Sequence, residues 1–539
     1  MEWMKWSRFK HALAASAVLA CGMVYGQSNA PGHWSKTMSD PQASLSESRS
    51  QFEDHFSSQE RGRSRGIKPF ERWMWWAEKH QDDGAKPRPD AWWEASASRR
   101  NALAVANNAE PWQLVGPDEV PIHGGAGRIN RIRISNNAWH ACAPAGGLWI
   151  SEDEGQTWSV RGADALAPLG ATDVWVDPFN DAHLWLATGD GNGADTYSIG
   201  VLESWDGGMT WIPLELAFEP DQSRRIHALA PHPSGNGHMW VATDIGLFQT
   251  LNGGATFSLV LPGQARDLQW LSHNVAVVAL EGDGLMRTDD GGATWETVLA
   301  GTPGITGRIQ LAAELFNDTL YAVAGHAFQQ NFLGFWQSTD AGATWTQTIS
   351  NLTGPNLLGY TVSGADNAGQ AFWDLCMALD PAESNHVLVG GVNVWETWDG
   401  GLTWNCPVHW QGADEAKYAH ADQHDIRFLA NGDVLLCNDG GVFRWDGEET
   451  VDLSDGLSIA QGYHVALDPI KAGTWLAGTQ DNGTILSRPG LTHRILDGDG
   501  FQCFFDSSTT DRLYASAYYG LLYRSDDGGR TMTSIANYF

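Results

Sequence analysis

The sequence predicts an all-β fold, a multi-bladed β-propeller of nine to ten four-stranded blades with a short helical N-terminal leader. A seven-bladed ring followed by a partial second propeller is the alternative. Three observations predict this fold. A turn of the type Ser-x-Asp-x-Gly-x-Thr-Trp recurs along most of the 539 residues. Intact copies lie roughly 40–60 residues apart, which is the period of propeller blades. Three short runs rich in β-branched and aromatic residues precede each turn and a fourth follows it, as in a four-stranded blade.

The repeated turns begin at SEDEGQTW (151–158) and continue to SDDGGRTM (525–532). One further blade without such a turn fits after the degraded copy RWDGEET, at YHVALD, TWLAGTQDNG and TILSR. This gives nine blade-like units between Gly127 and Phe539. The central Asp or Asn residues of the turns are Asp153, Asp206, Asn252, Asp290, Asp340, Asp399, Asp446 and Asp527.

The chemistry of the turn predicts a structural role. The Asp side chain can accept hydrogen bonds from backbone N–H groups inside the turn. Glycine can adopt the positive φ that other residues resist, and the Trp can pack between neighbouring blades. We therefore expect the turn to hold together the last two strands of each blade, without catalysis or calcium binding.

The first 26 residues have the features of a signal peptide. A basic start (Lys5 to Lys10) precedes the apolar stretch 12–24, which is too short to span a membrane. Cleavage after Gly26 is expected, and a lipobox ending at Cys21 is the alternative. Either way the sequence predicts a protein that is secreted or held at the outer cell surface.

Residues 27–50 are rich in Ser, Gln and Asn, which predicts a disordered linker. Residues 51–110 mix charged and aromatic residues without strand alternation, so we expect a helical leader or pro-segment there, with a second helix over 89–108. The propeller is expected over 111–539. The first leader helix is indicated by four residues at helical spacing, Phe70, Trp73, Trp76 and Ala77.

The composition argues against several classes of partner and site. The chain has 64 Asp and Glu against 33 Lys and Arg, and this acidic balance argues against a nucleic acid. No further apolar run is long enough to cross a bilayer. The cysteines of the mature chain show no CxxC or zinc-type spacing, which predicts small buried residues, with at most one disulfide, rather than a metal or redox site. They are Cys142, Cys376, Cys406, Cys437 and Cys503.

Several acidic, glycine-rich loops interrupt the repeat. Loops at equivalent blade positions emerge on one face, so we expect their carboxylates to ring one end of the central channel. The alternative is that Asp, Asn and Gly simply favour turns. The candidate ligand-binding residues in these loops are Asp190, Asn192, Asp195, Asn438, Asp439, Gln480, Asp481, Asn482, Asp497 and Asp499.

The motif HADQHD adds His420, Asp422, His424 and Asp425 to this set. If the motif approaches a strand, His420, Asp422 and His424 point to one side and could ligate a divalent metal, calcium or zinc. The alternative is a hydrogen-bonded polar cluster that fixes one blade to the next. No other cofactor is indicated.

The repeated turn resembles the Asp-box, or BNR repeat, of sialidases, two-propeller xyloglucanases and sortilin-type (VPS10) ten-bladed propellers. The resemblance covers about residue 112 to the end. It implies a propeller of the WD40/YVTN/BNR-like kind, and it leaves function open because that scaffold hosts both hydrolases and pure binders.

A narrower similarity is to secreted, sortilin-like BNR proteins of Bacteroidetes-type bacteria, many of which end in a type IX sorting domain. This sequence stops at ANYF, so we expect a C-terminal truncation or a different ring closure. The similar segments are the leader GIKPFERWMWW, APAGGLW (143–149), TGDGNGADTYSIGV (188–201), HADQHDI (420–426), CNDGGVF (437–443), GTQDNGT (478–484) and DGDGF (497–501).

Two functions follow from this pattern. The first is a secreted or cell-surface propeller that binds an extracellular protein, peptide or glycan through its loop face. The alternative is a secreted glycoside hydrolase whose carboxylate pair comes from Asp439, Asp481 and Asp499. A sialidase is disfavoured, since no full arginine set accompanies Arg128 and Arg131. No nucleophile elbow, phosphate loop or HExxH motif occurs.

Overall fold

The computed structural model describes residues 43–57, 67–81 and 114–535, with short gaps at 136–137, 163–169, 194–195, 236, 413–415 and 510. In the described part the chain forms nine antiparallel sheets, each made of four consecutive strands. This confirms the all-β propeller and the nine units expected from the sequence. The predicted signal peptide (1–26) and the second leader helix (89–108) lie outside the described residues.

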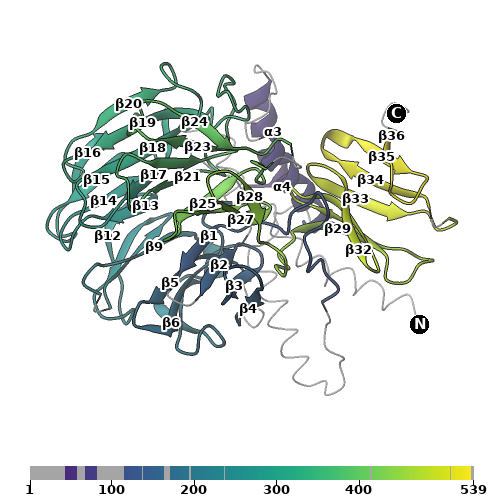
Figure 1. The fold of residues 1–539 in the computed structure, drawn as a ribbon, viewed down its shortest axis with the longest axis horizontal. Helices are drawn as coiled ribbons and strands as arrows, with labels where there is room; N and C mark the ends of the chain where they lie inside the picture. Colours follow the sequence, from purple (N-terminus) through teal and green to yellow (C-terminus); the bar gives the residue numbers. More distant parts are fainter. Residues whose placement is uncertain are drawn as a thin grey trace.

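The first seven sheets are blades 1 to 7 of one ring (Figure 1). Blades 1 to 4 consist of β1 (Arg131–Ile134), β2 (Trp139–Ala143), β3 (Gly147–Ser151), β4 (Ser159–Val160), β5 (Ala171–Asp177), β6 (Asn180–Thr188), β7 (Gly200–Ser204), β8 (Ile212–Ala217), β9 (Ile226–Pro231), β10 (Met239–Thr243), β11 (Gly246–Thr250), β12 (Ser258–Pro262), β13 (Ala265–Trp270), β14 (Ala276–Leu280), β15 (Gly284–Thr288) and β16 (Glu296–Ala300). Blades 5 to 7 consist of β17 (Thr306–Ala313), β18 (Leu320–His326), β19 (Phe332–Ser338), β20 (Thr346–Ser350), β21 (Cys376–Leu379), β22 (Val387–Gly390), β23 (Val394–Thr397), β24 (Asn405–Val408), β25 (Gln423–Phe428), β26 (Val434–Asn438), β27 (Gly441–Trp445) and β28 (Thr450–Asp452). A short 3-10 helix, η2 (Pro220–Gln222), follows blade 2.

The ring closes between blade 7 and blade 1. The innermost strands contact one another in chain order, and β25 of blade 7 contacts β1 of blade 1. Ile129 and Ile132 of blade 1 share a buried apolar cluster with Leu435 and Val442 of blade 7. Each blade contains only consecutive strands, so no strand is exchanged between blades. Closure depends on side-chain contacts and on backbone hydrogen bonds from Ile129 N–H to Asn438 and from Ala126 N–H to Gly440.

Three buried aspartates on inner strands link one blade to the next. Asp425 accepts a hydrogen bond from the backbone N–H of Ile132 at 3.0 Å, across the closing seam. Asp173 accepts from Leu229 N–H and Asp267 accepts from Leu311 N–H, each at 2.9 Å. The three carboxylates are almost fully buried, at 6%, 0% and 3% exposure. Asp425, expected to bind a ligand, therefore has a structural role here.

A β-bulge precedes each of these aspartates. The strand register shifts between Ala171 and Asp173, and likewise before Asp267 and Asp425. A bulge adds one residue to one strand and changes the direction of the side chains beside it. In β25 the extra residue is His424. This allows Asp425 to reach blade 1 while His424 turns into the centre of the ring face.

The repeated turns form the side chain to backbone bonds that their sequence predicts. In the turn at Asp290, Oδ1 accepts from Thr294 N–H at 2.9 Å and Oδ2 accepts from the Thr294 hydroxyl at 2.6 Å. The Thr288 hydroxyl oxygen accepts from Gly292 N–H, and Gly292 has a φ of 95°. These hydrogen bonds, led by the Thr294 hydroxyl, lower the pKa of Asp290 to about 2. The degraded turn at Asp446 keeps only backbone N–H donors, from Glu448 and Glu449.

Two further sheets stand apart from the ring, on the C-terminal side of the molecule in Figure 1. They contact each other through β29 and β33, so the alternative of a seven-bladed ring with a partial second propeller describes this chain. A strand-like bridge between Ile122 and His493 ties the segment before blade 1 to β32. The two sheets consist of β29 (Gly462–Leu467), β30 (Trp475–Thr479), β31 (Gly483–Arg488), β32 (Leu491–Leu496), β33 (Gly500–Phe505), β34 (Leu513–Ala517), the 3-10 helix η3 (Tyr518–Gly520), β35 (Leu522–Ser525) and β36 (Thr533–Ser534).

Two helices, α3 (Leu45–Phe56) and α4 (Ile67–His80), form the described part of the leader and contact each other (Figure 1). Ser44 caps α3, with Glu47 completing the capping box. The predicted linker over 27–50 thus includes helix from residue 45 onward, because this cap begins the helix earlier than composition suggested. No helix of the described residues is long and apolar enough to span a bilayer.

We expect Asp425→Ala to weaken the seam. The substitution leaves the buried N–H of Ile132 without its acceptor, which costs about 1–3 kcal/mol. Urea unfolding monitored by tryptophan fluorescence measures this loss. Replacement of the exposed Glu448 by Ala is the matched control, and equal midpoints for the two variants would contradict the role given to Asp425.

Candidate functional site

Residues from several irregular loops are hydrogen-bonded to one another. The amide of Asn192, from the loop after β6, lies 3.1 Å from Nδ1 of His424 in β25. Asn482, from the loop after β30, donates to the backbone oxygen of Asp439 at 2.8 Å. Residues separated by more than 200 positions in the chain therefore form one polar cluster. We call it the axial cluster; it consists of Arg128, Asn130, Asp190, Asn192, Trp373, Asp374, Asp422, His424, Asp439, Asp481, Asn482 and Asp499.

Arg128 anchors one side of the axial cluster. Its Nη2 lies 2.7 Å from Oδ2 of Asp190, and its Nε lies 4.0 Å from Oδ1 of Asp439. Asn130 donates to the second oxygen of Asp190 at 2.8 Å. The guanidinium also lies over the ring of Trp373, 4.2 Å from its centroid, which is a cation–π geometry. All five residues are buried, so these charges are paired inside the protein and do not form an open rim.

His424 and Trp373 hold the side chain of Asp439. His424 Nε2 lies 2.9 Å from Oδ1, and Trp373 Nε1–H donates to Oδ2 at 2.8 Å. Burial, with the nearby charge of Arg128, lowers the pKa of His424 well below its usual value. A neutral imidazole that accepts from Asn192 and donates to Asp439 satisfies both ring nitrogens.

The surroundings of two carboxyl groups of the cluster favour their protonated form. Burial raises the pKa of Asp439 well above its usual value, and the charge of Asp481 adds to the effect. Burial also raises the pKa of Asp374, with Asp422 as the next cause. Gln370 donates to Oδ2 of Asp374 at 3.2 Å. Oδ1 of Asp374 has no hydrogen-bond partner among the described residues. Like-charged carboxylates crowded in a dry site favour retention of protons.

Asp422 and Asp481 lie at the partly exposed edge of the axial cluster. Both have left-handed backbone, with φ of 68° and 55°, which is uncommon for residues other than glycine. Asp422 shares a side-chain hydrogen bond with Asp439. The N–H of Asp481 donates to Oδ1 of the buried Asp499 at 3.1 Å. Strained backbone of this kind concentrates at functional sites.

The remaining predicted residues have other surroundings. Asn438 is buried, and its Oδ1 accepts from Gly440 N–H, so it shapes a turn. Gln480 is buried and accepts from the hydroxyl of Tyr463. Asp497 is exposed and pairs with Arg494 at 3.0 Å. Asp195 lies outside the described residues.

The expected metal site at His420, Asp422 and His424 is not formed. Among the described residues no group of three or more His, Cys, Asp or Glu is arranged to hold a metal ion. The positive φ at Asp422 and the bulge at His424 break the strand alternation that would have put the three side chains on one side. His420 instead packs against Gly440, and its Nδ1 bonds to the oxygen of Ala421.

Sequence reasoning did not identify Trp373, Asp374, Asn130 and Arg128 as site residues. Trp373 and Asp374 come just before β21. Trp373 belongs to no repeated turn, and this departure from the repeat is the signal in the sequence that could have identified it. A buried Asp is not distinguishable in sequence from a turn-forming Asp.

The described cysteines are all free thiols, and four of the five are buried.

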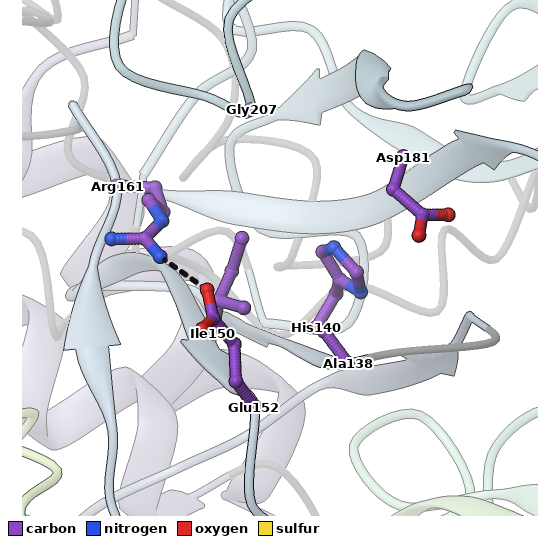
Figure 2. A pocket seen from close by; sticks show the side chains of 7 residues that line it. All are labelled: Ala138, His140, Ile150, Glu152, Arg161, Asp181 and Gly207. Atoms are coloured by element: carbon purple, nitrogen blue, oxygen red, sulfur yellow. Dashed lines mark hydrogen bonds and ion pairs between the residues drawn. The ribbon is translucent and has the colours of Figure 1, made fainter.

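A separate recess of about 400 Å³ lies between blades 1 and 2 (Figure 2). Arg161 and Glu152 form an ion pair of 3.2 Å at its edge, and burial lowers the pKa of His140 to about 4. Its lining includes residues of two repeated turns, whereas the axial cluster is built from the loops at the other strand ends. The lining residues are Ala138, His140, Ile150, Glu152, Arg161, Asp181 and Gly207.

Comparison with known proteins finds similarity in sequence and in fold. No family model matches the chain. A xyloglucanase of Paenibacillus sp is 26% identical over 325 residues, which is 51% of this chain and 30% of that protein, so the chain spans less than a third of that relative's length. The GH74 xyloglucanase of Xanthomonas campestris has a TM-score of 0.57 at 16% identity, covering 78% of this chain and 68% of that one. A GH74 enzyme of Niastella koreensis has a TM-score of 0.56 at 17% identity, covering 78% and 67%. These structural likenesses establish the propeller fold.

We expect Asp374 and Asp439 to contribute less to the stability of the protein as pH rises from about 4 toward neutrality. Unfolded Asp residues titrate near pH 4, while the raised pKa values keep Asp374 and Asp439 protonated in the folded state to higher pH. At these two carboxyls the folded state thus binds more protons in this interval, and their contribution to the free energy of unfolding decreases with pH. Asp374→Asn should therefore shift the slope of the free energy of unfolding against pH upward in urea unfolding at pH 5, 6, 7 and 8. Asp290→Asn, at a carboxyl already ionised throughout, should leave the slope unchanged; a slope unaffected by Asp374→Asn would contradict the assignment.

Proposed function

We propose that this protein is a glycoside hydrolase that cleaves a polysaccharide of the xyloglucan type at the axial cluster. The observation that carries the proposal is the group of carboxyls around Asp439, which combines a buried Asp439 of raised pKa with the partly exposed Asp422 and Asp481. Glycoside hydrolysis uses one protonated and one ionised carboxyl, whose different environments separate their pKa values. The xyloglucanase relatives support the same reading.

The buried position of Asp439 suggests how the proton would reach the substrate. Asp439 is only 2% exposed, so a glycosidic oxygen is more accessible to Asp422, which is hydrogen-bonded to it. We assign Asp439 as the proton store, Asp422 as the group that delivers the proton, and Asp481 as the opposing carboxylate. Asp499 accepts the Asp481 N–H and is assigned to positioning, in place of the catalytic role that the sequence left open for it.

The comparisons favour this hydrolase over the binding-only propeller that was our first hypothesis from sequence. They support a β-propeller; a sortilin-type identity and a protein or peptide ligand remain predictions. Export through the signal peptide also remains a prediction, and it fits a substrate that is found outside cells.

The proposal is tested by incubating the purified protein with xyloglucan, other plant and algal polysaccharides and sialylated glycans, and measuring released reducing sugar. Asp439→Asn and Asp481→Asn are each expected to lower turnover of the accepted polysaccharide by about 100-fold or more, as removal of an acid or base group does. Asp290→Asn, in a repeated turn, is the matched control and should retain activity. Tight binding of a glycan without any release of sugar would instead support the binding-only propeller.

A further inference from the structure

A small aromatic surface lies on the two C-terminal sheets. Tyr463 is on β29 and Phe501 is on β33, the innermost strands of these sheets, which contact each other. The two rings are stacked, with centroids 4.9 Å apart and an angle of 26° between their planes. We call these two rings, of which Tyr463 is 8% exposed, the aromatic pair.

The aromatic pair is directly connected to the axial cluster. The hydroxyl of Tyr463 donates to Oε1 of Gln480 at 2.9 Å, and Gln480 precedes Asp481 in the chain. Asp481 is in turn held by Asp499, which lies two residues before Phe501. Both rings are therefore fixed to the backbone that carries the proposed catalytic carboxylate.

Helix α4 of the leader covers the aromatic pair. The ring of Trp75 meets Tyr463 at a centroid distance of 6.5 Å and an angle of 85°, and meets Phe501 at 6.4 Å and 61°. Lys79, one turn later on the same helix, lies over Trp75 at 3.7 Å. An aromatic side chain from far away in the sequence thus contacts the aromatic pair, and its helix α4 lies beside the two C-terminal sheets (Figure 1).

The two leader helices have an apolar core of their own. Phe52 of α3 stacks on Phe70 of α4 at 3.7 Å, and Trp73, Met74 and Ala77 are buried in the same cluster. Arg49 and Glu78 add an ion pair between the helices. Trp75 is not a member of this cluster and remains half-buried, so it can leave the aromatic pair without disrupting the contact between the helices.

We propose that Tyr463 and Phe501 form a sugar-stacking subsite beside Asp481, and that Trp75 of the leader occupies this subsite as an intramolecular competitor of the glycan. The proposal rests on the function proposed above. Stacked aromatic rings with a hydroxyl at one edge suit a pyranose ring, which presents an apolar face and polar edges. A competitor attached to the same chain lowers the apparent affinity for the glycan by the fraction of molecules in which the subsite is open.

The test is calorimetric titration of xyloglucan oligosaccharides into the full chain carrying Asp439→Asn, so that the ligand is not consumed. Adding Trp75→Ala should tighten binding by about tenfold, because the subsite is then open in every molecule. Adding Tyr463→Ala should weaken binding, because the stacking surface is lost. Glu71→Ala, at an exposed position of α4, is the matched control and should leave affinity unchanged. Circular dichroism melting of each variant reports whether it folds.

The outcomes separate this inference from the proposed function. If Trp75→Ala binds xyloglucan oligosaccharides with the same affinity as the control, Trp75 is not a competitor, even where the wild-type chain hydrolyses xyloglucan. Unchanged affinity in a folded Tyr463→Ala variant overturns the subsite. Tighter binding by Trp75→Ala without hydrolysis by the wild type supports the subsite and refutes the hydrolase. Absence of binding in every variant overturns the inference.

Discussion

The buried aspartates that accept a backbone N–H from the next blade are the interaction on which the ring depends. A seven-bladed ring built only from consecutive strands has no shared strand to close it. Asp425 supplies a directional bond at the seam, and Asp173 and Asp267 make the same bond elsewhere in the ring. The electrostatic settings differ: Asp173 is buried, yet Arg133 and Arg131 lower its pKa, whereas burial raises the pKa of Asp267. The same geometry therefore tolerates different charge environments around the ring.

The same bulge that aims Asp425 at blade 1 delivers His424 to the axial cluster. Fold and site are thus coupled through a single extra residue in β25. The cluster combines a paired layer, the ion pair of Arg128 with Asp190, and a proton-rich layer around Asp439 and Asp374, where raised pKa values favour bound protons. The paired layer gives rigidity, and the proton-rich layer gives groups that can exchange protons. This division accounts for the presence of so many buried polar residues in the centre of a β-propeller.

The repeat could be read from the sequence because a turn with a fixed chemistry marks each blade. The number of sheets and the hydrogen bonds around Asp290 followed from that pattern. Ring closure did not, since the seam depends on which blades meet and not on any local motif. The axial cluster was predicted only in part: Asp439 and His424 lie in irregular motifs, but Trp373 and Arg128 become visible only when distant loops converge. The metal hypothesis failed because it assumed straight alternation through Asp422.

The way the ring closes also has a consequence for its biogenesis. During synthesis from the N-terminus, blade 1 is complete long before its neighbour at the seam exists. The apolar side of Ile129 and Ile132 must wait for Leu435 and Val442, some 300 residues later in the chain. Until then both ends of the incomplete ring expose apolar surface, which favours association between chains. Such a propeller therefore benefits more from chaperones, or from slow synthesis of its last ring blade, than a propeller whose ring is closed by a shared strand.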